Sequence, residues 1–144
     1  MSGGVNGIVY FLSLEVDCIH SFDLETEEWK QALSLPPLRS QQHDVSCVSA
    51  VVTLSNSLVV VDEIGISSTI DLWFLKDSEK ALWVKQYSII PAANSACHVP
   101  IMVLEDGKIL LFTRLGGSIS TYDPRANTWM KPTEAANPWM SVYV

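Results

Sequence analysis

The sequence contains one short phrase three times, as DLETEEW at residues 23–29, DSEKALW at 77–83 and DPRANTW at 123–129. Each phrase is an aspartate, five further residues and a tryptophan, and each follows a stretch rich in β-forming residues. An aspartate can accept hydrogen bonds from the backbone that follows it, and a proline fixes φ, so each polar middle predicts a turn. We therefore predict three β-hairpins, each with a tryptophan at the start of its second strand.

The hairpins recur at a spacing of about 50 residues, which predicts a repeat architecture. Turn signals recur at the same interval, at Asn6-Gly7, Asn56-Ser57 and Asp106-Gly107. The strands around these turns are nearly continuous in apolar residues, which is typical of sheets packed on both faces. No stretch has the 3.6-residue period of an amphipathic helix. The prediction is an all-β chain that forms a partial β-propeller of about three four-stranded blades.

Residues 1–144 are predicted to form a single domain with units at about 5–32, 45–90 and 97–132. The first unit is expected to lack its first strand, and residues 139–144 to begin the first strand of a further unit. Closed propellers typically need four or more blades, because fewer leave sheet faces and edges exposed. We therefore expect a piece of a longer propeller, an open arc, or a ring that closes with another copy.

Three stretches resemble the F-box-associated β-propeller domains of plant F-box proteins: VNGIVYFL at 5–12, IHSFDLETEEW at 19–29 and IDLWFLK at 70–76 up to Trp83. The third unit is also similar to a Kelch repeat, through Gly116-Gly117, Tyr122 and Trp129. The first two units depart from Kelch because they lack the double glycine. The F-box-associated domain is therefore the nearer resemblance, and it covers nearly the whole chain.

The resemblance implies a substrate-recognition module of a Skp1–cullin–F-box ubiquitin ligase. This chain carries no F-box, the helical module by which that family docks on its adaptor. It is thus expected to bind a target protein of unknown identity without being an enzyme, and to reach a Skp1-type adaptor only if an F-box is supplied elsewhere. One alternative is a propeller-family enzyme such as a sugar oxidase or hydrolase, which would need catalytic residue types clustered at the propeller axis. Another is a truncated, non-functional remnant.

The composition of the chain argues against nucleic-acid binding and membrane contact and favours a reducing compartment. The chain is 48% hydrophobic and 17% charged, with a net charge of −7 and no basic run, so it is predicted to be globular and not to bind nucleic acid. No apolar run approaches the roughly 18 residues that span a bilayer, so no membrane contact is expected. The three cysteines, Cys18, Cys47 and Cys97, have no paired spacing. A reducing compartment, cytoplasmic or nuclear, is therefore predicted.

The repeated residues are predicted to be structural. The tryptophans are expected to pack between adjacent blades, with strand-end carbonyls accepting from their indole N–H groups, and the aspartates to form the turns. The pairs Cys18/His20 and Cys97/His98 lack zinc-ligand spacing, so no metal, cofactor or catalytic site is expected. The structural set comprises Asp23, Trp29, Asp77, Trp83, Asp123 and Trp129.

Partner contacts are predicted on the loops of one rim of the propeller, because such loops join the strands of one blade and join one blade to the next. The candidate contact residues are Arg39, His43, Glu63, Ile66, Asn94 and Arg114.

Overall fold

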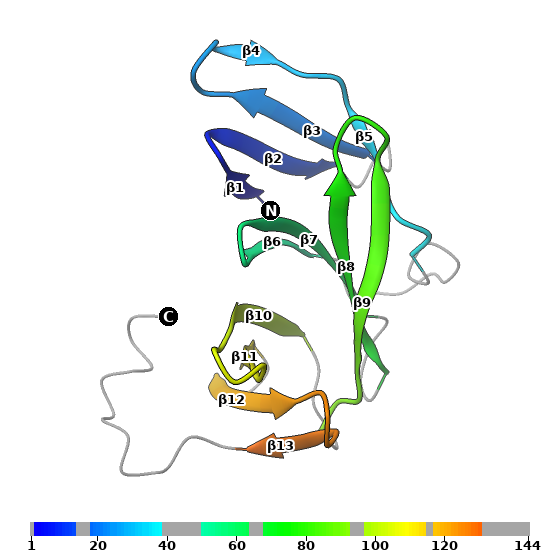
Figure 1. Cartoon of the computed structure of the whole chain (residues 1–144), viewed down its shortest axis with the longest axis vertical. Helices are drawn as coiled ribbons and strands as arrows, with labels where there is room; N and C mark the ends of the chain where they lie inside the picture. The colour runs from blue at the N-terminus through cyan, green and yellow to red at the C-terminus, as the bar shows by residue number, and fades with distance from the viewer. Residues whose placement is uncertain are drawn as a thin grey trace.

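The computed structural model describes residues 2–13, 18–38, 50–63, 68–92, 97–114 and 117–130. Within these ranges the chain is all-β: it forms three antiparallel sheets of four to five strands, and no helix occurs. Figure 1 shows the sheets following one another in chain order, with the first strands β1, β6 and β10 on one side of the molecule and the long strand β9 on the other. The predicted fold class is therefore confirmed at the level of antiparallel β-sheets.

Each sheet is a meander in which consecutive strands pair. The first sheet contains β1 (Ser2–Val5), β2 (Ile8–Ser13), β3 (Cys18–Asp23), β4 (Glu28–Trp29) and β5 (Leu33–Ser34); β5 is the exception to the meander, since it pairs with β3 beside β4. The second sheet contains β6 (Ala50–Leu54), β7 (Ser57–Glu63), β8 (Ile70–Asp77) and β9 (Leu82–Ile89). The third sheet contains β10 (His98–Val103), β11 (Ile109–Thr113), β12 (Ser118–Asp123) and β13 (Thr128–Met130).

The prediction that the first unit lacks its first strand is wrong. Strand β1 pairs with β2 along its whole length, from Ser2 opposite Phe11 to Val5 opposite Ile8. The pairing follows from the turn between them, in which Asn6 and Gly7 both have positive φ, at 52° and 77°. Such a two-residue turn matches the twist of the flanking strands, so even four residues can continue the ladder. The further strand predicted at 139–144 lies outside the described residues.

The turn of the second sheet also differs from the prediction. Ser55 and Asn56 adopt the positive φ values, and Leu54 pairs with Ser57, so the turn lies one residue earlier than Asn56-Ser57. Pro100 behaves as its missing N–H requires: it lies on β10, at the edge of the third sheet, next to a register shift between Pro100 and Met102.

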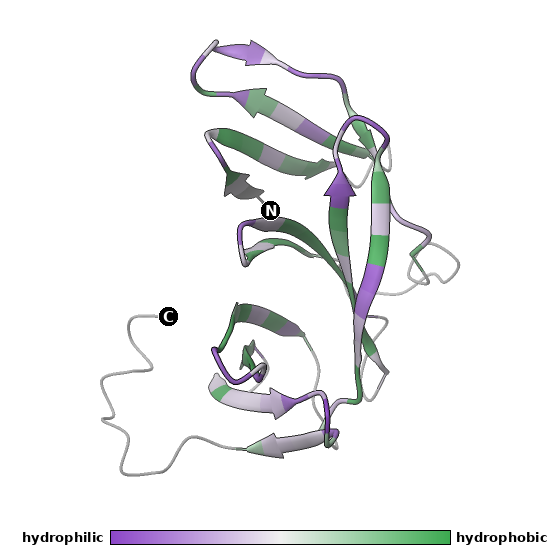
Figure 2. Cartoon of the chain, in the orientation of Figure 1, coloured by the Kyte–Doolittle hydropathy of each residue, from purple (hydrophilic) through white to green (hydrophobic). Residues whose placement is uncertain are grey.

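Two apolar clusters join the three sheets. One cluster lies between the first and second sheets and includes Tyr10, Ile19, Leu58 and Val60. The other lies between the second and third sheets and includes Val59, Leu72, Ile109 and Tyr122 among its members. Side chains alternate between the two faces of a strand, so neighbouring residues of β7 serve different clusters. The second sheet is thus covered on both faces, as Figure 2 reflects in the predominance of hydrophobic colour along β6 and β7.

The three Asp–Trp hairpins share one backbone feature. The fourth residue after each aspartate, Glu27, Ala81 or Asn127, lies in the left-handed region, with φ of 58°, 49° and 52°. This conformation brings the Cβ of an L-residue close to the following carbonyl oxygen, and glycine alone adopts it without that cost. Asparagine tolerates this conformation better than alanine does, so the strain is greater at Ala81 than at Asn127.

We expect Ala81→Gly to stabilise the protein by about 0.5–1 kcal/mol, because relief of the left-handed strain exceeds the added entropy of the unfolded chain. The matched control is Ala126→Gly in the third hairpin, where φ is not positive and the same change should destabilise. Urea denaturation of both variants measures the difference. Equal losses of stability would contradict this account of the hairpins.

Candidate functional site

A groove of about 520 Å³ lies between the first sheet and the β8–β9 hairpin of the second sheet. One side is formed by side chains of β2 and β3 together with the segment 30–34, and the other by residues 78–81 at the tip of the hairpin. Figure 1 shows this hairpin reaching up beside β5. The groove therefore lies where the β8–β9 hairpin of the second sheet comes alongside the first sheet.

Trp83 holds the two sides of the groove together. Its indole Nε1 donates a hydrogen bond to the backbone carbonyl of Ser34, at 2.8 Å, and Ser34 itself lines the groove. Trp129 makes the same kind of contact one sheet further along, donating to the carbonyl of Ile90 at 2.6 Å. In both cases a tryptophan bonds to backbone near the end of the preceding sheet, as predicted for these residues.

Trp29 departs from the prediction made for the repeated tryptophans. It is 66% exposed, and its ring contacts Phe22 and Phe11 of its own sheet, with centroid distances of 5.1 and 6.0 Å. The reason is geometric: Trp83 and Trp129 each pack on the sheet before their own, and the described chain contains no sheet before the first.

We call the contact of a hairpin tryptophan with the preceding sheet a joint, and removal of the indole N–H of Trp83 tests the joint beside the groove. We expect Trp83→Phe to lower the free energy of unfolding by about 1–2 kcal/mol, because the Ser34 carbonyl loses its partner. Leu24→Ala is the control and should change stability by less than about 0.5 kcal/mol, since Leu24 is 58% exposed at the tip of the first hairpin. Denaturation curves of the two variants compare them directly, and equal losses would argue against the joint.

The lining of the groove combines charge with hydroxyl groups. Lys30, Glu79 and Lys80 are exposed at its rim, and Ser21 and Tyr10 are buried at its inner side. Burial raises the pKa of the Tyr10 phenol above its ordinary value, because the charged phenolate would lose its contact with water. Figure 2 shows hydrophilic colour at the tip of the β8–β9 hairpin. Such a surface suits hydrogen bonding and ion pairing with a polar, charged segment of another molecule.

Two of the predicted rim contacts, Glu63 and Arg114, are among the described residues, and neither lines this groove. Arg39, His43, Ile66 and Asn94 lie outside the described residues. Arg114 is exposed at the end of β11, where its backbone N–H donates to the carbonyl of Cys97 at 3.0 Å, and it does not line the groove.

Glu63 is buried, and so it is not available as a surface contact. One carboxylate oxygen accepts from the backbone N–H of His98 at 2.9 Å, and the other lies 2.7 Å from Nδ1 of the same histidine. The His98 ring in turn lies 5.6 Å from the ring of Trp129. Glu63 and His98 therefore lock the second sheet to the third beside the Trp129 joint.

Removal of one partner from this buried pair should lower the free energy of unfolding, because the other polar group then stays buried without a hydrogen-bond partner. We expect Glu63→Ala to lower the free energy of unfolding by about 3–5 kcal/mol. Glu79→Ala, at an exposed glutamate, should change it by no more than about 0.5 kcal/mol. Urea denaturation measures both free energies of unfolding. A decrease below about 1 kcal/mol for Glu63→Ala would show that the Glu63–His98 contact does not hold the second and third sheets together.

The repeated aspartates form the hairpin turns, as predicted. Oδ1 of Asp23 accepts from the backbone N–H of Glu25 at 2.9 Å, and Oδ1 of Asp77 accepts from that of Glu79 at the same distance. Asp123 accepts from the N–H of Arg125 at 3.0 Å. These carboxylates are engaged by their own turns, which is the role that short polar side chains play there.

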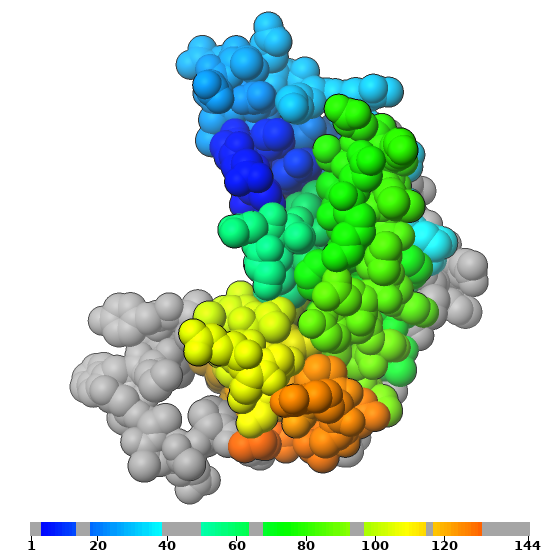
Figure 3. Space-filling model, in the orientation of Figure 1, coloured from blue at the N-terminus to red at the C-terminus, as the bar shows by residue number. Residues whose placement is uncertain are grey.

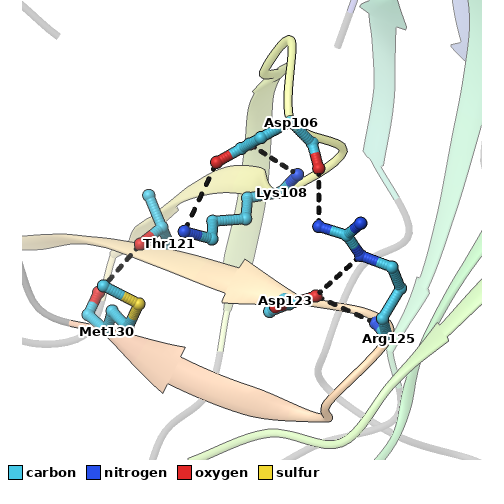
Figure 4. Close-up of polar contacts among 6 residues, drawn as sticks. All are labelled: Asp106, Lys108, Thr121, Asp123, Arg125 and Met130. Carbon is cyan, nitrogen blue, oxygen red and sulfur yellow. Dashed lines mark hydrogen bonds and ion pairs between the residues drawn. The ribbon is translucent and has the colours of Figure 1, made fainter.

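The third sheet adds a polar network around its turns, shown in Figure 4. The Arg125 guanidinium donates to the backbone carbonyl of Asp106 at 2.8 Å and lies 3.6 Å from the Asp123 carboxylate. The backbone N–H of Lys108 donates to the Asp106 carboxylate at 3.1 Å and holds its pKa below the ordinary value. The network ties the β10–β11 turn to the β12–β13 hairpin.

Two buried aspartates were not anticipated from the sequence. Asp62 of β7 lies directly opposite Asp71 of β8, and both are buried. Asp71 accepts from the Ser88 hydroxyl at 2.7 Å, and the Lys85 ammonium lies 3.9 Å from its other oxygen. Asp62 directly continues the apolar run 58–61, which is the sequence signal that could have placed it in a strand. Neither aspartate lines the groove.

A cysteine and a histidine lie close together on β3, where Cys18 Sγ is 3.5 Å from His20 Nε2. Cys18 is a free thiol. The described ranges contain no group of three or more His, Cys, Asp or Glu side chains that could hold a metal ion. In the same ranges, no helix has the length and apolar character needed to cross a membrane.

Comparison with known proteins does not assign the groove. No protein-family model matches the chain, and no significant match was found among curated proteins. The role of the groove is therefore inferred from its residues, its contacts and the sequence resemblance described above.

Proposed function

We propose that the three sheets are consecutive blades of a partial β-propeller and that the chain is a non-catalytic protein-binding module. The propeller arrangement is supported by the repeated joint, in which Trp83 and Trp129 bond to the preceding sheet. It is also supported by β6, which lies beside both β1 and β10, the first strands of the neighbouring sheets. Figure 3 shows the sheets following one another along a curved body, as consecutive blades do.

The observation that carries the binding role is the groove between the first two sheets. Binding sites are concave, and they combine an apolar base with a few polar groups that orient the ligand. Here Ile8 and Leu33 provide apolar surface, while Lys30, Glu79 and Lys80 provide charge at the rim. Because both signs of charge are present, the expected ligand is a polypeptide segment with charged side chains, which forms ion pairs at the rim.

The place of this module in a ubiquitin ligase rests on the resemblance to F-box-associated domains. In this proposal the groove receives the target protein, and a Skp1-type adaptor is reached only through an F-box supplied elsewhere. The Trp83 joint supports the binding role, because it fixes the spacing of the groove walls before a target arrives. Such preorganisation lowers the entropic cost of binding.

The proposal is tested by affinity capture from a plant extract with the wild-type chain, Lys80→Glu and Lys76→Glu. Both lysines are exposed on the same hairpin, but only Lys80 lines the groove. We expect proteins retained by the wild-type chain to bind Lys80→Glu at least about tenfold more weakly, because the new carboxylate would repel an acidic group that pairs with Lys80. Lys76→Glu should retain them, and thermal unfolding confirms that both variants are folded.

A second arm carries an F-box fused upstream of the chain. The adaptor should then appear in the eluate together with the captured targets, and only in this arm. Recovery of the adaptor by the bare chain would overturn the proposed route to the ligase. Capture that is equal for all three versions of the hairpin would exclude the groove as the binding site.

A further inference from the structure

The outer face of the first sheet is aromatic, and no other sheet of the described residues packs on it. Val9, Phe22 and Trp29 lie opposite one another across β2, β3 and β4, and Phe11 lies two residues along the same face. Trp29 and Phe11 are 66% and 39% exposed. The alternate residues of β2 pack against the second sheet instead. A contiguous exposed aromatic patch of this kind marks an interaction surface.

The equivalent face is covered in the other two sheets. Trp83 and Trp129 occupy the same hairpin position as Trp29, and each donates its indole N–H to a backbone carbonyl of the preceding sheet. Trp129 also packs against the apolar cluster that the second sheet contributes. The partner that fits the Trp29 face is therefore a sheet of this same architecture, placed ahead of the first one.

A face able to receive such a joint lies at the other end of the chain. Met102, Leu110, Thr121 and Met130 lie opposite one another across the third sheet. They alternate with Ile109, Leu111 and Tyr122, which pack on the second sheet, so they face away from it. Met102 and Met130 are 47% and 51% exposed. This outer face corresponds to the faces by which the first and second sheets receive the sheet that follows them.

We propose that a second copy of this chain covers both uncovered faces. The Phe11/Trp29 face of each copy docks on the Met102/Met130 face of the other, in the relation that the second sheet has to the first. One copy cannot join its own ends, because the second sheet separates them. Two copies supply six sheets, which exceeds the four that closed propellers require. The pair would contain two identical head-to-tail joints, with the groove left free.

Charge also favours the head-to-tail order. The first hairpin carries exposed acidic residues at Glu25, Glu27 and Glu28, and the third hairpin carries Arg125, whose side chain is 73% exposed. Consecutive sheets hold their hairpins at equivalent positions, so the joint places the acidic hairpin of one copy beside the Arg125 hairpin of the other. Opposite charges at the rim of an interface fix its register.

Sedimentation velocity of the full 144-residue chain tests the proposal. The expected mass is about 32 kDa, twice the 15.9 kDa of one chain. Trp29→Asp and Met102→Asp change opposite ends of the chain, and each should weaken the pair at least tenfold by burying a charge in both joints. Leu24→Asp, at an exposed apolar residue of the first hairpin tip, is the matched control and should leave the mass unchanged.

Mixing the two variants separates this joint from other modes of pairing. A mixture of Trp29→Asp and Met102→Asp restores one unaltered joint, so it should form a heterodimer although each variant alone does not. A monomeric wild-type chain, a pair that survives either substitution, or an open series of larger masses would each overturn the proposal. Circular dichroism confirms that the variants are folded. The readout is mass, so the outcome is independent of whether the groove captures a target.

Discussion

The structure depends on one recurring contact, the hydrogen bond from a tryptophan indole to a backbone carbonyl of the preceding sheet. Trp83 makes it to Ser34 and Trp129 makes it to Ile90. The ring supplies a large apolar surface for the joint, and the N–H donates a hydrogen bond to the backbone of the preceding sheet. Each hairpin places its tryptophan by the same local geometry, an aspartate-capped turn followed by a residue with positive φ.

The joints differ in what reinforces them. Between the second and third sheets, the buried Glu63–His98 pair adds hydrogen bonds next to Trp129. Between the first and second sheets, the Thr53 hydroxyl donates to the carbonyl of Gly4 at 3.2 Å, and the groove opens beside Trp83. The less densely reinforced joint is thus the one that offers a concave, polar surface. The position of the proposed binding site follows from how the sheets meet, and its residues come from segments far apart in the chain.

Local chemistry determined much of what could be predicted. The three hairpins and their turn-forming aspartates follow from hydrogen bonds and steric limits among a few adjacent residues. The register of the second sheet was less accessible, because Ser55-Asn56 and Asn56-Ser57 are both plausible turns. Strand pairing across the whole sheet selected the first of these. Strand β1 was missed because four glycine-rich residues give little propensity signal before they pair.

By itself, the sequence determined an all-β chain built from a repeated hairpin, because its turns and strands are specified within each unit. Only the tertiary structure decided which repeated residues are covered and which are exposed. Trp29 and Trp83 occupy the same place in their hairpins, yet one is exposed and the other bonds to Ser34. Glu63 follows the buried run of β7 and reaches a histidine 35 residues away. The burial and the hydrogen-bond partner of a repeated side chain depend on the sheet that packs against it. The sequence of a single repeat unit does not specify that neighbouring sheet.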